Sequence, residues 1–168
     1  MNAYQELWWR QARSDYAVLL LLRRQGADPC HYLHYLQMVT EKIAKAFFWR
    51  SGKEPPRSHA AFVQFLRSFG GIQASKREQI ADVFEFASFQ VLQNSIRKTL
   101  PLAYELEHLA PTLAQNGPNP EYPWPPAAPQ HAPAMFDFGI WTQLTSTGHG
   151  RQLMQIIEVA VEKFPSYG

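Results

Sequence analysis

Two histidines one helical turn apart are the first residues in this sequence whose types and spacing could do chemistry. His31 and His34 stand at positions i and i+3 of a segment with helical periodicity, so their imidazoles share one face. Two imidazoles placed in this way can supply half of a zinc site. Because no cysteine or carboxylate at a suitable spacing accompanies them, the sequence predicts surface histidines, no metal and no cofactor.

A charged pair follows on the same predicted helix. Glu41 and Lys45 are four residues apart, and Lys45 is a candidate ligand-binding residue. The structural alternative, which we favour, is a solvated Glu–Lys pair that stabilises its helix by about 0.3–0.5 kcal/mol. The apolar periodicity of the segment places both residues, with His34, on the wetter face of the helix.

A third set of candidate residues lies in a proline-rich stretch. Glu121, Tyr122 and Trp124 combine one carboxylate with two amphipathic rings, the side chains that commonly line the rim of a ligand pocket. The same stretch could instead be recognised by an aromatic-lined groove of another protein. The reading we prefer is a strap that docks on its own domain, because folded segments flank it on both sides.

Several amphipathic helices are needed to position these groups. Apolar residues recur at helical spacing in six segments. We expect helices over residues 3–25, from Cys30 to before Gly52, from an N-cap at Ser58 to Phe69, from a capping box at Ser75 to about Val91, from a restart at Pro101 to about Pro111, and after Gly150.

Residues 116–138 form the predicted strap. Seven of the thirteen prolines fall within residues 117–133, which precludes helix and favours an extended, polyproline-like path. The large rings at positions 122, 124, 136 and 138 are poor linker residues, so we expect an ordered strap. The sequence therefore predicts one all-α domain over residues 1–168: a bundle core (1–115), the strap (116–138) and a C-terminal helical segment (139–168), arranged as an antiparallel bundle of five to six helices.

The helical pattern resembles that of a known superfamily. Trp9-x-x-Ala12-x-x-Asp15-Tyr16-x-x-Leu19-Leu20, followed by Glu41-Lys42-x-x-Lys45-Ala46 and then Pro55-Pro56-Arg57-Ser58-His59, is similar to HEPN (higher eukaryotes and prokaryotes nucleotide-binding) domains over residues 5–115. The resemblance implies a small helical bundle that forms homodimers. It also implies a nucleotide or RNA as ligand, or a nucleotidyltransferase as protein partner.

HEPN ribonucleases carry Arg-x4–6-His on a late helix, where histidine moves a proton and arginine stabilises phosphoryl charge. The candidates here are Arg97 and His108, eleven residues and ~16 Å apart on a straight helix, with Pro101 between them. Arg24 and His31 match the spacing but lie across a predicted turn. The departure from the family pattern favours binding without catalysis.

Composition narrows the class of protein. The chain has 46% apolar residues and a single cysteine, as expected of a globular domain in a reducing cytoplasm without disulfides, and it shows no membrane span or signal peptide. Residues 1–98 carry a net charge of +6 and residues 99–168 a net charge of −4. We therefore expect a HEPN-like homodimer that binds a nucleotide, RNA or a protein partner without cleaving it. The alternatives are a metal-independent endoribonuclease or toxin with a non-standard site, and a purely structural interaction domain.

Overall fold

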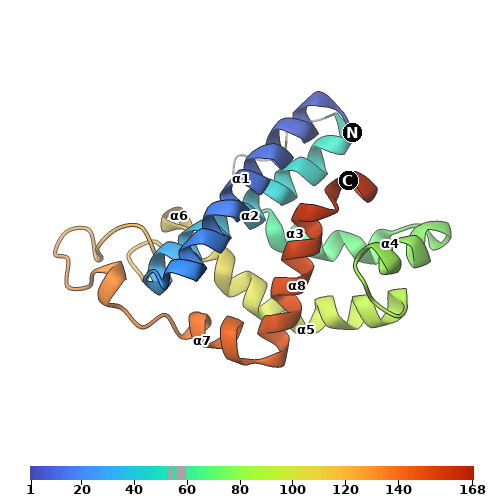
Figure 1. Cartoon of the computed structure of the whole chain (residues 1–168). Helices are drawn as coiled ribbons and strands as arrows, with labels where there is room; N and C mark the ends of the chain where they lie inside the picture. Colours follow the sequence, from blue (N-terminus) through green and yellow to red (C-terminus); the bar gives the residue numbers. More distant parts are fainter. Residues whose placement is uncertain (53–54, 56–59) are drawn as a thin grey trace.

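The computed structural model describes residues 1–52, 55 and 60–168, and this part of the chain is all-α. Its only β-type pairing is an isolated bridge between Trp124 and His131. The described residues contain eight α-helices rather than the five to six expected (Figure 1). The helices are α1 (Ala3–Gln25), α2 (Pro29–Phe48), α3 (Phe62–Ser68), α4 (Arg77–Val83), α5 (Phe89–Glu107), α6 (Pro111–Ala114), α7 (Gly139–Ser146) and α8 (Gly148–Glu162).

Helices α1 and α2 form a hairpin, and the predicted bounds of α1 are confirmed. Asn2 and Gln5 make a reciprocal capping box at the start of α1. Gly26 ends the helix in the left-handed conformation, with a φ of 64°. Pro29 then starts α2, where its missing N–H is no loss. Figure 1 shows the two helices side by side.

Pro101 does not restart a helix, contrary to the prediction; it lies inside a continuous α5. Proline removes the hydrogen bond to the carbonyl of residue 97. Both Pro101 and Arg97 are exposed, so water can satisfy that carbonyl. The apolar face of α5 meanwhile continues through Leu102 and Leu106, which are buried. Packing on both sides of the proline therefore holds one helix together.

Two short helices that were not expected, α6 and α7, account for the larger number, and the bounds of a further predicted helix are wrong. The helix expected from Ser75 to Val91 ends at Val83, because Glu85 adopts a left-handed conformation with a φ of 62°. Ser88 then caps α5. Position 75 forms no capping box, and Ser58 and His59 lie outside the described residues. The C-terminal segment divides at Thr147, whose hydroxyl accepts a hydrogen bond from the N–H of Gly150 at 2.9 Å.

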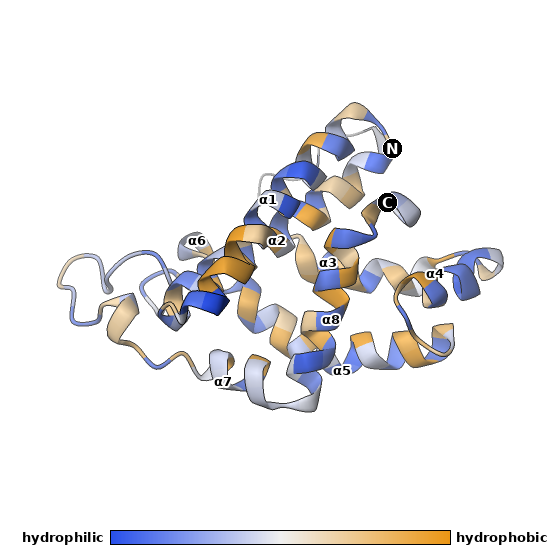
Figure 2. Ribbon diagram, viewed as in Figure 1, coloured by the Kyte–Doolittle hydropathy of each residue, from blue (hydrophilic) through white to orange (hydrophobic). Residues whose placement is uncertain are grey.

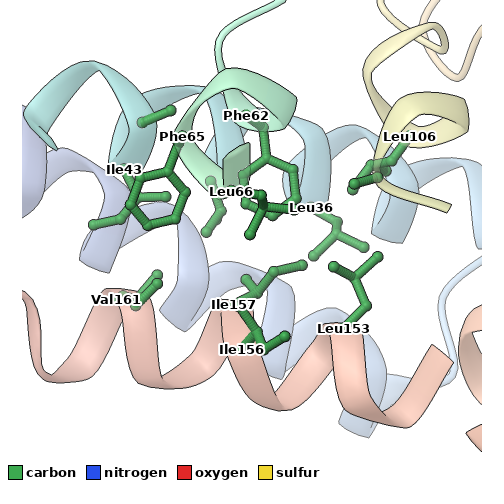
Figure 3. Packing of buried hydrophobic residues seen from close by; sticks show 14 of the residues in the cluster. Leu36, Ile43, Phe62, Phe65, Leu66, Leu106, Leu153, Ile156, Ile157 and Val161 are labelled. Carbon is green, nitrogen blue, oxygen red and sulfur yellow. The ribbon is translucent and has the colours of Figure 1, made fainter. Parts of the chain in front are cut away.

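The core lies where α2, α3, α5 and α8 meet. The short helix α3 contributes Phe62, Phe65 and Leu66, all wholly buried. Figure 3 shows these side chains between residues of α2 and α8, among them Ile43 and Ile157. Hydrophobic and hydrophilic residues alternate along α5 and α8 in Figure 2, as expected for helices with one buried face. Only three of the 23 aromatic side chains, all tyrosines, are highly exposed.

The strap is partly enclosed by the fold. Trp124 and Phe138 are buried, and Phe136 packs edge-on against both rings. Tyr122 and Met135 point to solvent. Figure 1 shows the strap extending to one side of the bundle between α6 and α7. Within the residues that the structure describes, no helix combines the length and the apolar character needed to cross a bilayer.

A buried carboxylate joins α5 to the start of α3. Glu107 accepts a hydrogen bond from the backbone N–H of Val63 at 2.8 Å, which supplies the cap that α3 lacks locally. Burial raises the pKa of Glu107 above its ordinary value, and the backbone N–H groups of Val63 and Phe62 lower it to a smaller extent. The folded chain therefore holds this proton more tightly than the unfolded chain does.

This raised pKa predicts a pH dependence of stability. The contribution of Glu107 is fully present below the ordinary glutamate pKa and is lost as the pH rises through the higher folded-state value. Glu107→Gln keeps an oxygen acceptor for Val63 but cannot ionise. We expect its free energy of unfolding, relative to that of the wild type, to increase with pH across this interval. Urea titrations at a series of pH values measure the difference, and a difference independent of pH would contradict the assignment.

Candidate functional site

Arg97 and His108 lie on one exposed side of α5 but do not meet within one chain. Their eleven-residue separation on a continuous helix corresponds to ~16 Å. The Nδ1 atom of His108 lies 2.9 Å from the carbonyl oxygen of Tyr104, and the two rings stack with centroids 3.9 Å apart. With Pro101, these residues follow a spacing of four, three and four, and form what we call the α5 stripe.

Arg97 instead shares a hollow with Arg67 of α3. This arginine hollow has a volume of about 210 Å³ and lies between α3 and α5. Its lining consists of Leu66, Arg67, Phe69, Gly70, Gln93, Ile96, Arg97 and Leu100. No carboxylate and no imidazole is among these residues. Within the described part of the chain, neither guanidinium forms an ion pair.

The arginine hollow has the chemistry of an anion site with an apolar floor. Guanidinium groups bind phosphate oxygens through two parallel N–H bonds. Leu100 and Ile96 offer an apolar surface beside the two cations. The positive potential of Arg67 also reaches Glu107, whose pKa it lowers slightly against the effect of burial. The hollow can therefore bind a phosphate group, but its lining contains no group suited to proton transfer at neutral pH.

Two other predicted residues, Glu121 and Tyr122, lie at a second hollow, of about 280 Å³, beside the start of α2. His31, His34 and Pro120 complete this strap hollow. The Nδ1 atom of His34 lies 3.4 Å from a carboxylate oxygen of Glu121, which brings the strap against α2. No group of three or more His, Cys, Asp or Glu side chains in the described residues is placed to hold a metal ion.

Lys45 and Trp124 lie apart from both hollows. Lys45 forms an ion pair with Glu41, and its ammonium lies 5.2 Å from the ring centroid of Trp8. Glu41 is buried and His34 and Lys45 are half-buried, so the face predicted to be wetter is largely covered. Trp124 is only 4% exposed and packs within the strap, where its ring has little surface to offer a ligand.

The chain was compared with known families, curated proteins and solved structures. None of them matches it. The resemblance to HEPN domains therefore stays a prediction, and the site rests on its own geometry.

Arg67 was not among the predicted site residues. It lies thirty residues before Arg97 and belongs to no motif. The spacing of Phe62, Phe65 and Phe69 predicted the helix that carries Arg67 and its buried face. It did not predict that α5 packs beside this helix. Only the packing of α3 on α5 brings the two arginines to one hollow.

Proposed function

We propose that this chain is a HEPN-like helical module that binds the phosphate groups of RNA or of a nucleotide at the arginine hollow without cleaving them. The proposal rests on one observation: two guanidinium groups from different helices line a hollow that contains no carboxylate. Such an arrangement stabilises a bound anion and is unfavourable for a cationic ligand. The basic excess of residues 1–98 agrees with this choice of ligand.

The α5 stripe extends the proposed site beyond a single phosphate. Tyr104 is exposed and stacks on His108, which gives a flat surface on which a base can stack. Arg97 lies ~10 Å along the helix from Tyr104, two turns away. A single strand could therefore place a phosphate at the arginine hollow and a neighbouring base on the Tyr104 ring.

The test is the binding of a fluorescently labelled, single-stranded RNA, measured by anisotropy. Arg67→Ala and Arg97→Ala should each weaken binding by roughly tenfold, because each removes a charge-assisted hydrogen bond to phosphate. Each should also reduce the slope of log K against log salt concentration by about 0.7.

Arg10→Ala is the matched control, because Arg10 is exposed and paired with Glu6 on α1, outside the hollow. It should bind RNA as the wild type does. Equal affinity of the two hollow variants and the wild type would rule out the arginine hollow as the RNA site.

We also propose that the module is a homodimer. Support comes from α1, where Tyr4, Leu7 and Leu21 are exposed and share one side of the helix by their spacing. Exposed apolar residues gathered on one side of a helix are typical of interfaces. Light scattering should give about twice 19.3 kDa, and a monomer at tens of micromolar would contradict the proposal.

The alternative function is a metal-independent endoribonuclease. It is supported by the spacing of the α5 stripe, four, three and four residues, which is the same in both directions along the helix. If two copies of α5 paired antiparallel about a point between Pro101 and Tyr104, Arg97 of one copy would face His108 of the other. That pairing would place a cation and an imidazole at one phosphate. It would require the stripe to be an interface between copies rather than an RNA-binding surface.

A further inference from the structure

A third hollow, which we call the tyrosine hollow, lies among α1, α2, α7 and α8 and has a volume of about 260 Å³. Leu144 and Met154 form apolar parts of its lining. Its polar lining consists of Arg23, Tyr32, Thr145, Arg151, Gln155 and Glu158. The volume is just below the range of about 300–1,000 Å³ that is usual for ligand sites, so the occupant must be small.

Among the described residues, Tyr32 provides this hollow with an unpaired hydrogen-bond donor. Its side chain is 4% exposed, and its ring packs edge-on against Trp141 at a centroid distance of 4.8 Å. In the described part of the chain no group forms a hydrogen bond with its hydroxyl, and the hydroxyl is not one of the fully enclosed unpaired atoms, so it is free to bond a ligand in the hollow. Burial raises the pKa of Tyr32, so the hydroxyl keeps its proton and can donate a hydrogen bond.

Two arginines line the hollow together with Tyr32. Arg23 is close enough to Tyr32 and Tyr16 to lower the pKa of each, against the larger effect of burial. Arg151 donates a hydrogen bond to the carbonyl of Ser146 at 3.3 Å, which holds its guanidinium at the end of α7. Neither arginine forms an ion pair within the part of the chain that the structure describes.

The hollow also has a negative end. Arg151, Gln155 and Glu158 follow one another at i, i+4 and i+7, along one stripe of α8. This spacing separates the guanidinium and carboxylate positions by ~10 Å along the helix. An oxyanion is therefore favoured at the arginine end, and a hydrogen-bond donor at the glutamate end.

We propose that the tyrosine hollow binds a small organic oxyanion, a carboxylate or a phosphate monoester, whose apolar body carries a hydrogen-bond donor at the opposite end. The oxyanion accepts hydrogen bonds from Arg23, Arg151 and the Tyr32 hydroxyl. The body lies against Leu144 and Met154, and the donor bonds to Glu158. This site shares no residue with the arginine hollow.

The test is a calorimetric titration of the full chain with benzoate, 4-aminobenzoate, phenyl phosphate and inorganic phosphate. We expect saturable binding of the aromatic anions and weaker binding of inorganic phosphate, which has no apolar body. Tighter binding of phenyl phosphate than of benzoate would identify phosphate monoesters as the ligand class, and the reverse order would identify carboxylates. Absence of saturable binding for all of the aromatic anions would overturn the proposal.

Variants then locate the site. Arg23→Ala and Tyr32→Phe should each weaken binding by roughly tenfold, because each removes a hydrogen bond to a charged group. Tyr32→Phe keeps the buried ring, so the fold is preserved. Arg24→Ala, at the neighbouring exposed arginine outside the hollow, and Arg97→Ala should leave binding unchanged. Unchanged affinity in both Arg23→Ala and Tyr32→Phe would overturn the assignment.

Glu158 supplies a test of ligand orientation. The wild type should bind 4-aminobenzoate more tightly than benzoate, because only the amino compound has a donor for the carboxylate. Glu158→Gln should remove most of this preference without abolishing benzoate binding. An equal preference in the wild type and the variant would contradict the role given to Glu158. Because the RNA experiment uses a different hollow and different variants, either proposal can fail without the other.

Discussion

Replacing Gly150 with alanine should destabilise the protein by about 3 kcal/mol, the upper part of the usual range for overpacking. A Cβ atom at this position would lie 2.1 Å from the carbonyl oxygen of Gln143 and 2.6 Å from the Cα of Leu144. Both atoms belong to the backbone of α7, so no side-chain rotation can relieve the clash. Helix α7 would have to move away from α8, at the expense of the buried contacts of Leu144 and Leu153.

Thermal unfolding measures the effect. For a chain of this length the expected loss corresponds to a decrease in Tm of about 6–12 °C. Gly148→Ala is the matched control, because a Cβ atom there would have no heavy atom within 4 Å. Its stability should differ from the wild type by no more than about 0.5 kcal/mol. Equal stability of the two variants would show that α7 and α8 are not packed as closely as described.

Trp124→Ala should also destabilise the protein by about 3 kcal/mol, the lower end of the range for removing a buried large ring. The ring of Trp124 contacts three other rings of the strap, those of His131, Phe136 and Phe138. Removing the indole leaves a cavity and deprives these rings of their common neighbour. We expect a lower Tm and faster proteolysis within residues 117–138.

Tyr122→Ala provides the control for the strap, because that side chain is 60% exposed although it lies only two positions away. Its effect on stability should stay within about 0.5 kcal/mol. If both variants unfolded like the wild type, and protease cut the strap of the native protein rapidly, the strap would be a free linker rather than part of the fold.

The sequence was most informative where local signals decide the structure. The end of α1 before Gly26 follows from a residue with few backbone choices, and α2 starts at Pro29, one residue before the predicted Cys30. Pro101 was misread because the local rule predicts a break, whereas burial of Leu102 and Leu106 and exposure of the proline preserve the helix. No residue type near Glu85 indicates its left-handed conformation, so the end of α4 could not be predicted.

The candidate site was less predictable than the helices. Glu121 and Tyr122 lie at a hollow, as expected of rim residues, whereas Trp124 is buried. A polyproline-like path has three residues per turn, so positions 122 and 124 face different directions, and sequence alone does not say which faces the bundle. Arg67 shares a hollow with Arg97, and Arg151 shares one with Arg23, only because their helices pack together. Residues so far apart in the sequence give no local signal of this proximity.

Binding without cleavage is tested most directly by the fate of RNA bound to the purified protein in the presence of a metal chelator. We predict that single-stranded RNA binds, with affinity that depends on Arg67 and Arg97, and is recovered at full length on a denaturing gel. The geometric reason is that no imidazole lines the arginine hollow and His108 lies ~16 Å along α5 from Arg97. Cleavage that disappears in both Arg97→Ala and His108→Ala, while both variants remain folded, would contradict binding without catalysis and establish the endoribonuclease alternative.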